Sequence, residues 1–264
     1  MAGQSDPTAD LARANAARVH DWLLGGSFNT PIDRVVAAQI ESIWPSLRQI
    51  LRASRAFLGL AVEHMLERGV RQFVELGAGL PMSGHVHHLV RDQDEATVVY
   101  VDKDPVVAAH GDSALRGIPG TAYIQADIAA PQEVLAHEAT RRLIDFERPV
   151  GVLMIEILHL LPDQARPGSL VNSYRECLCA GSGIALSHVT SEWAPQIELL
   201  NTVHGDLLGR ATPRDRPDLI PWISGLSLVE PGLASLSDWP LPHGEDHGQT
   251  EPLRNTLAAI GYTP

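Results

Sequence analysis

The chain has 264 residues, of which 44% are hydrophobic, so it can bury one sizeable core and carry an extension. Its 20 Lys and Arg residues against 32 Asp and Glu residues give a net charge of −12, which argues against a general nucleic-acid binder. No apolar run is as long as a membrane span, and residues 1–20 lack the apolar centre of a secretory signal. We therefore expect a cytoplasmic protein with no membrane and no nucleic-acid partner.

The first quarter of the chain contains segments with helical character. Their ranges are residues 7–24, 32–43 and 46–68. Pro31 and Pro45 stand where helices begin or break, and the turn-rich connection LLGGSFNTP separates the first two segments. We expect residues 1–68 to form an N-terminal helical extension, or lid, and residues 69–264 to form the main domain.

After these helices, short apolar runs alternate with amphipathic stretches. The runs are RQFVEL, TVVYVD, AYIQAD, VGVLMIE and GIALSHV, and LSLVEPGL follows as a further expected strand. Strand, helix and strand at this spacing predict a parallel sheet with crossover helices. We expect residues 241–264 to form a loop followed by a short helix.

The first run ends in VELGAGLP, in which Glu75 is followed by Gly77 and Gly79. In an open parallel sheet, ligands bind beyond the carboxyl ends of the strands, and glycines at the first turn let a ligand approach the backbone. Asp102 ends the second run, where a carboxylate can accept both hydroxyls of a ribose. A further carboxylate, Asp127, ends the third run. A GxG alone is as often a plain turn, but with these carboxylates it predicts a nucleoside site.

The residues around the turn favour S-adenosylmethionine over a dinucleotide. Met82 stands where the dinucleotide fingerprint has its third glycine, and we expect a helix to begin near Ser83. Glu75 comes just before the turn, where it would repel a phosphate but could pair with an ammonium group. A ligand with a ribose, an adenine and a cationic amino-acid tail fits this site best.

Stretches across nearly the whole chain resemble the actinobacterial S-adenosyl methyltransferase family, formerly a domain of unknown function. They are ARVHDWLLGG (17–26), NTPIDR (29–34), SRAFL (54–58), RQFVELGAGLP (71–81), VVYVDKDPVV (98–107), QADI (125–128), RPVGVLMIEILHLLPD (148–163), GSGIALSHVT (181–190) and LVEPGL (228–233). The resemblance implies a doubly wound α/β fold with a mostly parallel, seven-stranded methyltransferase sheet, helices on both faces and N-terminal helices over the cofactor. It also implies that the cofactor is S-adenosylmethionine.

Carried over by position, the resemblance assigns a set of residues to the cofactor. They are Glu75, Gly77 and Gly79 at the methionine end, Asp102 at the ribose with Lys103 beside it in the chain, Asp127 and Ile128 at the adenine, and Asp21, Gly25, Gly26 and Asn29 in a loop that would close over the pocket. The chain departs from the family pattern at Ser27 and Phe28, where a Lys-Asp pair is usual, and at His85, where an Asn is usual. These departures fall near the expected substrate side.

Methyl transfer from a sulfonium is an in-line displacement that depends largely on holding nucleophile and methyl group together, so no catalytic triad is required. If the acceptor is an amine, a hydroxyl or an acidic carbon, a base helps to remove its proton. The candidates are His159 and His188, which we expect just beyond strand ends, and Glu156 at the end of the fourth run. For each histidine, a structural role is the alternative.

Several functions are compatible with these residues. The leading one is a methyltransferase that acts on a small molecule, for example in secondary metabolism. Another keeps the cofactor but closes a ring within it and releases methylthioadenosine, and a third senses S-adenosylmethionine without catalysis. We expect no metal site, because no Cys or carboxylate completes the pair of His85 and His88. A homodimer is left open.

Overall fold

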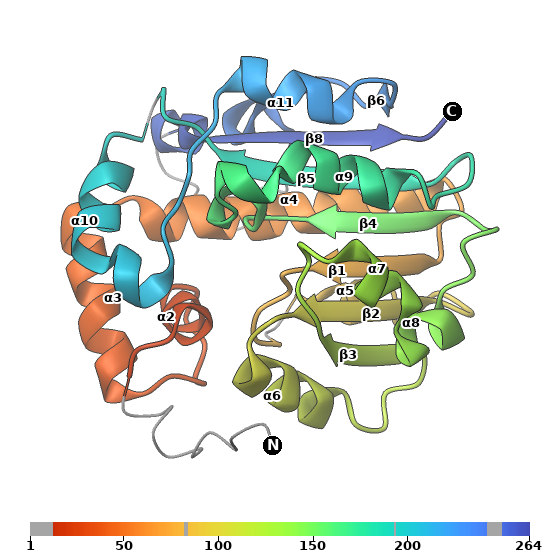
Figure 1. Cartoon of the computed structure of the whole chain (residues 1–264), viewed down its shortest axis with the longest axis horizontal. Coiled ribbons are helices and arrows are strands. Elements are labelled where there is room, and N and C mark those ends of the chain that lie inside the picture. The colour runs from red at the N-terminus through yellow and green to blue at the C-terminus, as the bar shows by residue number, and fades with distance from the viewer. Residues whose placement is uncertain (1–12, 82–83, 193, 242–249) are drawn as a thin grey trace.

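The computed structural model describes residues 13–81, 84–192, 194–241 and 250–264. A central sheet has helices on both faces, and a further group of helices lies beyond one end of its strands (Figure 1). Within the described residues, no helix is long and apolar enough to cross a membrane. Met82, Ser83 and the first twelve residues of the expected lid lie outside this part of the chain.

Among the described residues, eight strands form one sheet in the order β3-β2-β1-β4-β5-β8-β6, and β7 pairs with β8 beside this path. Their bounds are β1 Gln72–Leu76, β2 Thr97–Asp102, β3 Thr121–Gln125, β4 Val150–Met154, β5 Gly183–Val189, β6 Ser227–Leu228, β7 Ala234–Ser235 and β8 Thr256–Tyr262. Strands β1 to β5 are parallel, whereas β8 is antiparallel to its neighbours. The strand order reverses between β1 and β4, so the turn after β1 lies at the switch point of the sheet. The doubly wound, mostly parallel α/β fold is confirmed.

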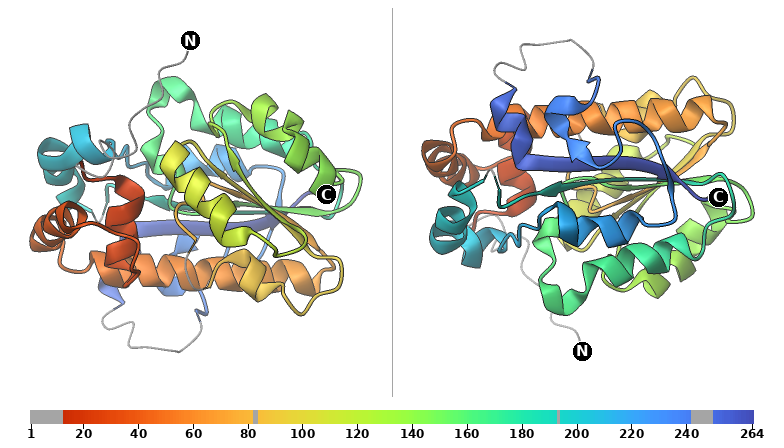
Figure 2. Two further views of the ribbon diagram at one scale, coloured as in Figure 1. Left: turned by 90° about the horizontal axis from the view of Figure 1, so that it is seen from below. Right: turned by 90° about the horizontal axis from the view of Figure 1, so that it is seen from above.

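Helices cover both faces of the sheet (Figure 2). One face carries α4 (Leu47–Glu67), α5 (Val86–Leu89) and α6 (Pro105–Leu115), and the other carries α7 (Pro131–Ala136), α8 (Glu138–Leu143), α9 (Pro167–Arg175) and α11 (Arg216–Ile223). Single turns of 3-10 helix are η1 (Leu158–Leu160), η2 (Asp163–Ala165), η3 (Leu236–Asp238) and η4 (Glu251–Asn255). Strands β1 and β4 are buried at every position, which matches the near-continuous apolar runs that predicted them.

Helix α4 packs on the sheet and also on the helices that precede it in the chain. Its Phe57 and Met65 are fully buried against the strands, and a Cβ added at Gly151 of β4 would lie 2.7 Å from Met65 Sδ. Leu51, nearer the start of the helix, is buried instead in a small separate core within the lid. Because one continuous helix contributes residues to both cores, α4 connects the preceding helices to the sheet.

The C-terminal segment differs from the expected loop and short helix. Residues 242–249 lie outside the described part, and η4 leads into β8, which is buried at every position between β5 and β6. Its sequence TLAAIGY includes good helix formers, but cross-strand pairing and burial on both faces override that propensity. The expected strand over LSLVEPGL is also shorter, because β6 ends at Leu228 and Pro231 has no N–H to extend the ladder. The sheet thus has an eighth strand in the part described, because the short β7 also pairs with β8.

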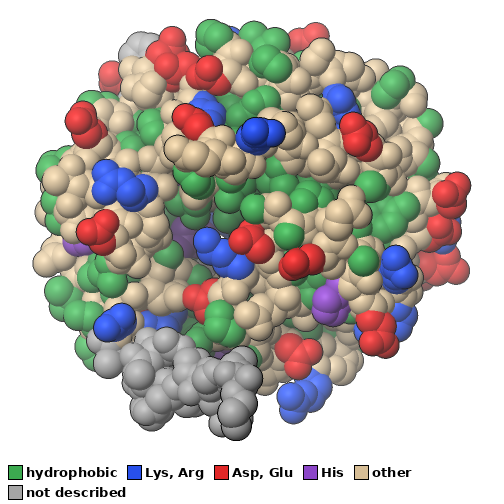
Figure 3. All heavy atoms as spheres, in the orientation of Figure 1, with side chains coloured by type: hydrophobic (Ala, Val, Ile, Leu, Met, Phe, Trp, Pro, Cys, Tyr) green, Lys and Arg blue, Asp and Glu red, His purple; other side chains and the backbone are tan. Residues whose placement is uncertain are grey.

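Beyond the carboxyl ends of the parallel strands lie α2 (Ala16–Leu23), α3 (Pro31–Ile43) and α10 (Gln196–Leu208) (Figure 1). We call α2, α3 and the loop between them the lid helices. The first of them begins at Ala16, where Asn15 caps it by accepting hydrogen bonds from two backbone N–H groups, and residues 7–12 of the predicted helical segment lie outside the described part. Figure 3 shows a hollow on this face between these helices and the sheet, with a histidine side chain inside it.

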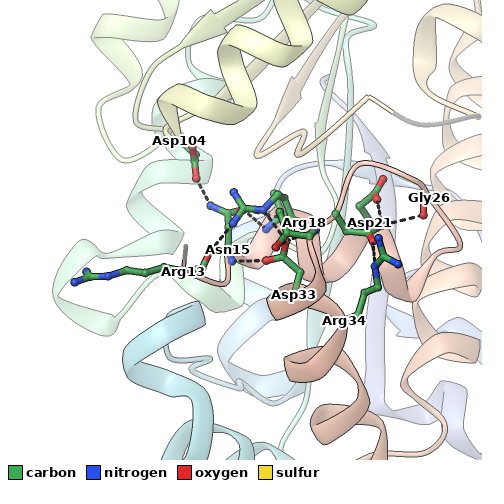
Figure 4. Close-up of polar contacts among 11 residues, drawn as sticks. Arg13, Asn15, Arg18, Asp21, Gly26, Asp33, Arg34 and Asp104 are labelled. Carbon is green, nitrogen blue, oxygen red and sulfur yellow. Dashed lines mark hydrogen bonds and ion pairs between the residues drawn. The ribbon is translucent and has the colours of Figure 1, made fainter. Parts of the chain in front are cut away.

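A buried polar network joins the starts of α2 and α3 (Figure 4). Asp33 is fully buried and accepts hydrogen bonds from Arg18 Nε at 2.8 Å, Asn15 N at 3.0 Å, and both Thr30 N and Thr30 Oγ1 at 2.7 Å. Thr30 and Asp33 together cap α3, whose first residue is Pro31. The stretch NTPIDR is therefore a helix start whose carboxylate also fastens the neighbouring helix.

Candidate functional site

The turn after β1 takes the backbone conformation that its glycines predict. Gly77 and Gly79 have φ of +69° and +66°, in the left-handed region that favours glycine. A Cβ at Gly77 would lie 2.2 Å from Ile157 Cγ1, so the turn and the segment after β4 are in close contact. The N–H groups of Gly77 and Ala78 both donate to Val101 O, at 2.8 and 3.0 Å. The turn is thus fixed to β2 on one side and packed against the β4 end on the other.

Asp102 lies beside this turn, as the sequence predicts. Its Oδ2 accepts a hydrogen bond from Gly79 N at 3.0 Å, and its Oδ1 accepts one from Asp104 N at 3.0 Å. Burial raises the pKa of Asp102, although the two N–H groups oppose this shift. Lys103, the next residue, is exposed. Each carboxylate oxygen of Asp102 still has a lone pair, so the group can accept further hydrogen bonds.

Glu75 is buried next to the partly exposed Arg55, and both have unused hydrogen-bonding capacity. Glu75 is 3% exposed, and its Oε1 lies 3.5 Å from Arg55 Nη1 of α4. Glu75 Oε2 and Arg55 Nη2 are both buried and have no hydrogen-bond partner among the described residues. Burial raises the pKa of Glu75 to about 7, against the opposing charge of Arg55. Glu75 and Arg55 therefore each keep one atom without a hydrogen bond in the described part of the chain, and His85 Nδ1 lies 4.0 Å from that oxygen of Glu75.

Glu156 occupies the corresponding place after β4. Its Oε1 accepts hydrogen bonds from Ser54 Oγ at 3.0 Å and from Ser187 Oγ at 3.1 Å, and its backbone N–H donates to Ser187 Oγ at 2.9 Å. Its Oε2 makes no hydrogen bond with the residues that the structure describes. Glu156 has φ of +55°, which is uncommon outside glycine and is found disproportionately at functional sites. Burial raises its pKa, and the two serine hydroxyls oppose that shift.

Consecutive residues of α4 therefore serve the two carboxylates. Ser54 binds Glu156, and Arg55 pairs with Glu75. The sequence stretch SRAFL contains both residues, but sequence reasoning gave neither a role. The feature of the sequence that could have indicated their roles is the adjacent serine and arginine among the apolar residues of α4.

The position of His188 differs from the prediction. It lies within β5 rather than beyond it, is fully buried, and has both ring nitrogens occupied. Nδ1 lies 2.7 Å from Val189 O, and Nε2 lies 3.2 Å from Arg214 Nη1, so Nδ1 carries the proton and Nε2 accepts. Burial lowers the pKa of His188 to about 3, which keeps the ring neutral. This geometry agrees with the structural alternative.

His159 differs from His188 because one of its nitrogens is unused. It lies in η1, and its buried Nδ1 has no hydrogen-bond partner in the described part of the chain. Burial and the charge of Arg214 lower its pKa to about 4. His20 of α2 has its pKa lowered to about 4 as well, by burial and by the charge of Arg55. Two neutral imidazoles, one from the lid and one from the β4 end, therefore belong to the same region.

The four predicted lid residues hold their own loop together (Figure 4). Asn29 Nδ2 donates to Asp21 Oδ2 at 2.9 Å and to Gly26 O at 3.0 Å. A Cβ at Gly26 would lie 2.0 Å from Asp21 Oδ1, which explains the glycine, and Gly25 has φ of +84°. The loop is compact, and these residues make its internal contacts.

The lid also touches the body of the protein next to Asp102. Asn15 Nδ2 donates to Asp104 Oδ2, and the ring of Phe28 stacks on His110 of α6 with centroids 3.7 Å apart. Because Asp104 N binds Asp102, the lid is two hydrogen bonds away from that carboxylate.

Asp127 and Ile128 follow β3 at the same edge of the sheet. Asp127 is exposed, and its Oδ1 accepts a hydrogen bond from Ala129 N at 2.8 Å. Ile128 is buried, and its carbonyl accepts from Tyr174 Oη at 3.2 Å. Among the described residues no hydrogen bond joins the side chain of Asp127 to Asp102, and Asp102 lies opposite Gln125 where β2 pairs with β3.

Comparisons with known proteins agree with this arrangement. A model of the S-adenosyl methyltransferase family matches residues 2–264. A DUF574 family protein from Streptomyces avermitilis is 30% identical, with 97% of this chain and 99% of that chain covered and a TM-score of 0.90. A candidate methyltransferase from Thermobifida fusca is 31% identical, with 97% of each chain covered and a TM-score of 0.88.

A more distant structure shows likeness of fold alone. The plantazolicin methyltransferase BamL, solved with S-adenosylhomocysteine and a substrate analogue, is 11% identical, with 97% of each chain covered and a TM-score of 0.53. No curated protein matches this chain. The family match and the two close structures confirm the resemblance seen in the sequence, and the chain belongs to the S-adenosyl methyltransferase family, whose members are transferases that use S-adenosylmethionine.

Proposed function

We propose that this site transfers a methyl group from S-adenosylmethionine to a small molecule, and that Glu75 and Arg55 hold the amino-acid end of the cofactor. The observation that carries this assignment is the pair of buried, unpaired atoms, Glu75 Oε2 and Arg55 Nη2. An α-ammonium group donates hydrogen bonds and an α-carboxylate accepts them, so an amino acid would satisfy both atoms. The glycine turn beside them leaves room for close approach of the ligand.

The remaining cofactor contacts follow the strand order. Asp102, with Lys103 next to it, would accept the ribose hydroxyls through its free lone pairs, and Asp127 and Ile128 would flank the adenine beyond β3. When bound, S-adenosylmethionine supplies an electrophilic methyl group on a sulfonium. The negative net charge of the chain supports a small-molecule acceptor over nucleic acid. The cytoplasmic location and a homodimer stay predictions.

We assign the acceptor end of the site to the segment after β4. Glu156 has an unused oxygen there and His159 an unused ring nitrogen, and both remain candidates for the base that removes the acceptor's proton. His188 has no unused nitrogen and instead fixes Arg214. Arg214 in turn donates to Leu161 O at 2.9 Å and thereby holds the turn that carries His159.

Binding of S-adenosylmethionine is expected to weaken as the pH falls below about 7. Glu75 must be ionised to pair with the ammonium group, and burial raises its pKa to about 7 in the free protein. Below that pKa each bound ligand displaces a proton, so the affinity should fall about tenfold per pH unit. Calorimetry with S-adenosylmethionine between about pH 5.5 and 8.5 measures this dependence.

The other titratable groups around Glu75 do not ionise in this range. Burial holds the pKa of His85 well below its usual value and raises that of Tyr100, and Arg55 stays charged. Glu75→Gln should therefore weaken binding at pH 8 and flatten the profile. Methylthioadenosine, which lacks the amino acid, should give a flat profile with the unaltered protein. If the affinity for S-adenosylmethionine is equally independent of pH, Glu75 does not bind the ammonium group.

We also propose that the lid helices, within the extension of residues 1–68, close over the cofactor bound to the main domain of residues 69–264. Support comes from the contacts of Asn15 and Phe28 with the segment after β2. Cleavage by subtilisin near Gly25 and Gly26 is expected to slow when S-adenosylmethionine is added, whereas cleavage near the exposed Gly117 should not change. Equal rates at the first position with and without saturating cofactor would mean that this loop is not the closing element.

A further inference from the structure

We propose that the methyl acceptor is an amine, whose nitrogen is received by the free oxygen of Glu156. This inference rests on the proposed function, because it places the acceptor relative to a cofactor held by Glu75 and Arg55. It names a substrate class that neither the fold nor the family match supplies.

The first argument is the position of Glu156. Ile157, the next residue, packs against Gly77 of the cofactor turn, and Ser54, the partner of Glu156, precedes Arg55 on α4. The carboxylate therefore lies next to the methionine end, on the β4 side. In a bound cofactor the sulfur lies between the amino-acid end and the adenosine, so a carboxylate next to the amino-acid end would lie nearer the sulfonium than the adenine.

The second argument is how firmly this carboxylate is held. Two serine hydroxyls from different elements, α4 and β5, bind the same oxygen, and the backbone N–H of Glu156 is bound to Ser187 as well. The backbone of Glu156 is in the left-handed region, which is uncommon for a residue other than glycine. One oxygen is thus committed to the protein, and the other is presented in a fixed position, which is the preorganisation that stabilises a developing charge.

The third argument is the charge around it. His20 and His159 are neutral, because burial lowers the pKa of each to about 4. Of the arginines whose charges act on them, Arg55 pairs with Glu75 and is assigned through its free Nη2 to the cofactor carboxylate, and Arg214 binds Asp163 at 2.7 Å and neighbouring carbonyls. An anionic acceptor would meet the Glu156 carboxylate with neither of these arginines free to offset it. A nitrogen that becomes cationic during the reaction would be stabilised there.

The step balances with these groups. The lone pair of a neutral amine forms the new N–C bond as the S–C bond breaks, and the electron pair of that bond stays on sulfur, which becomes a neutral thioether. The positive charge passes to nitrogen beside Glu156, and the N–H proton moves to Oε2. Burial raises the pKa of Glu156, which favours its acceptance of that proton.

A pair of cofactor analogues tests this placement without knowledge of the substrate. S-adenosylhomocysteine has a neutral thioether at the reacting position, whereas sinefungin carries an amino group where the transferred methyl would be. We expect sinefungin to bind about ten- to a hundredfold more tightly than S-adenosylhomocysteine, the range for one charge-assisted hydrogen bond. Calorimetry with each analogue gives the ratio of the two dissociation constants.

Matched variants test whether Glu156 causes the difference between the two dissociation constants. Glu156→Gln should bring the ratio to about one while leaving the affinity for S-adenosylhomocysteine unchanged, and Glu75→Gln should weaken both analogues equally and keep the ratio. Glu156→Asp, which withdraws the carboxylate, serves if the Gln variant does not fold. A ratio of one in the unaltered protein, a ratio that survives Glu156→Gln, or an equal loss of both analogues in that variant would overturn the proposal. Failure of the unaltered protein to bind either analogue would instead overturn the proposed function.

Discussion

Replacing Arg55 with methionine is expected to weaken the binding of S-adenosylmethionine by about a hundred- to a thousandfold. The change removes the donor that we assign to the α-carboxylate of the cofactor, and it leaves Glu75 buried without its cation. Removing one partner of a buried charge pair costs about 2–5 kcal/mol, much of it from the charge left unpaired. Calorimetry with purified, folded variants measures the dissociation constants.

Helix α4 supplies a matched control for this substitution. Arg52 lies three residues earlier and is exposed, so Arg52→Met should leave binding unchanged. Arg55→Lys keeps the charge but not the forked donor, and it should give an intermediate affinity. Methylthioadenosine has no carboxylate and should bind Arg55→Met as it binds the unaltered protein. If Arg55→Met loses methylthioadenosine as well, the arginine supports the pocket in general and does not recognise the amino-acid end.

Asp33→Ala is expected to lower the free energy of unfolding of the lid helices by about 3–5 kcal/mol, because it breaks a buried ion pair with Arg18. Asp33 also accepts the hydrogen bonds that start α2 and α3, so both helices lose a cap contact. Hydrogen exchange of the α2 and α3 amides reports the local loss, and urea unfolding reports the global one. Asp112→Ala, on the exposed face of α6, should change either value by less than about 0.5 kcal/mol.

The carboxylate of Asp33 also predicts that the stability of the lid helices depends on pH. Burial disfavours its charged form, but the bonds from Arg18, Thr30 and Asn15 prevail and hold the pKa of Asp33 below its usual value. A lowered pKa in the folded state means that the contribution of Asp33 is complete above the unfolded value of about 4 and is lost as the pH falls through the folded value. After correction for the intrinsic pH dependence of amide exchange, the lid amides should therefore exchange faster in acid than at neutral pH. This acid-induced increase should be absent in Asp33→Ala. An unaltered exchange profile in the variant would contradict this role.

The sequence by itself determined the parallel strands of the sheet and the position of the glycine turn after β1. Both follow from local patterns: apolar runs of strand length, separations long enough for crossover helices, and glycines just after the first run. Asp102 could be placed beside Gly79 because parallel neighbouring strands bring their carboxyl ends to one edge. The lid was visible as helical segments before the first strand, although its beginning depended on the cap at Asn15.

The sequence misassigned β8 because the cause of its conformation is not local. TLAAIGY carries no strong strand pattern, and it is extended because β5 and β6 pair with it on either side. Partners that lie far away in the chain, and burial on both faces, can override helix propensity. The same reason applies to His188, whose neutral, bonded state is set by Arg214 and Val189 within the folded sheet.

The surroundings of Glu156, which we propose as the acceptor end of the site, were decided only by the tertiary structure. Ser54 and Glu156 are 102 residues apart, and Ser187 is a further 31 residues along, so no local pattern could join them. The same holds for Arg55 and Glu75, which come from a helix and a strand that meet only across the core. A sequence shows which side chains can carry a charge or a proton. Burial and distant neighbours decide which of them are ionised and unpaired, because both depend on the solvent and partners that folding removes or supplies.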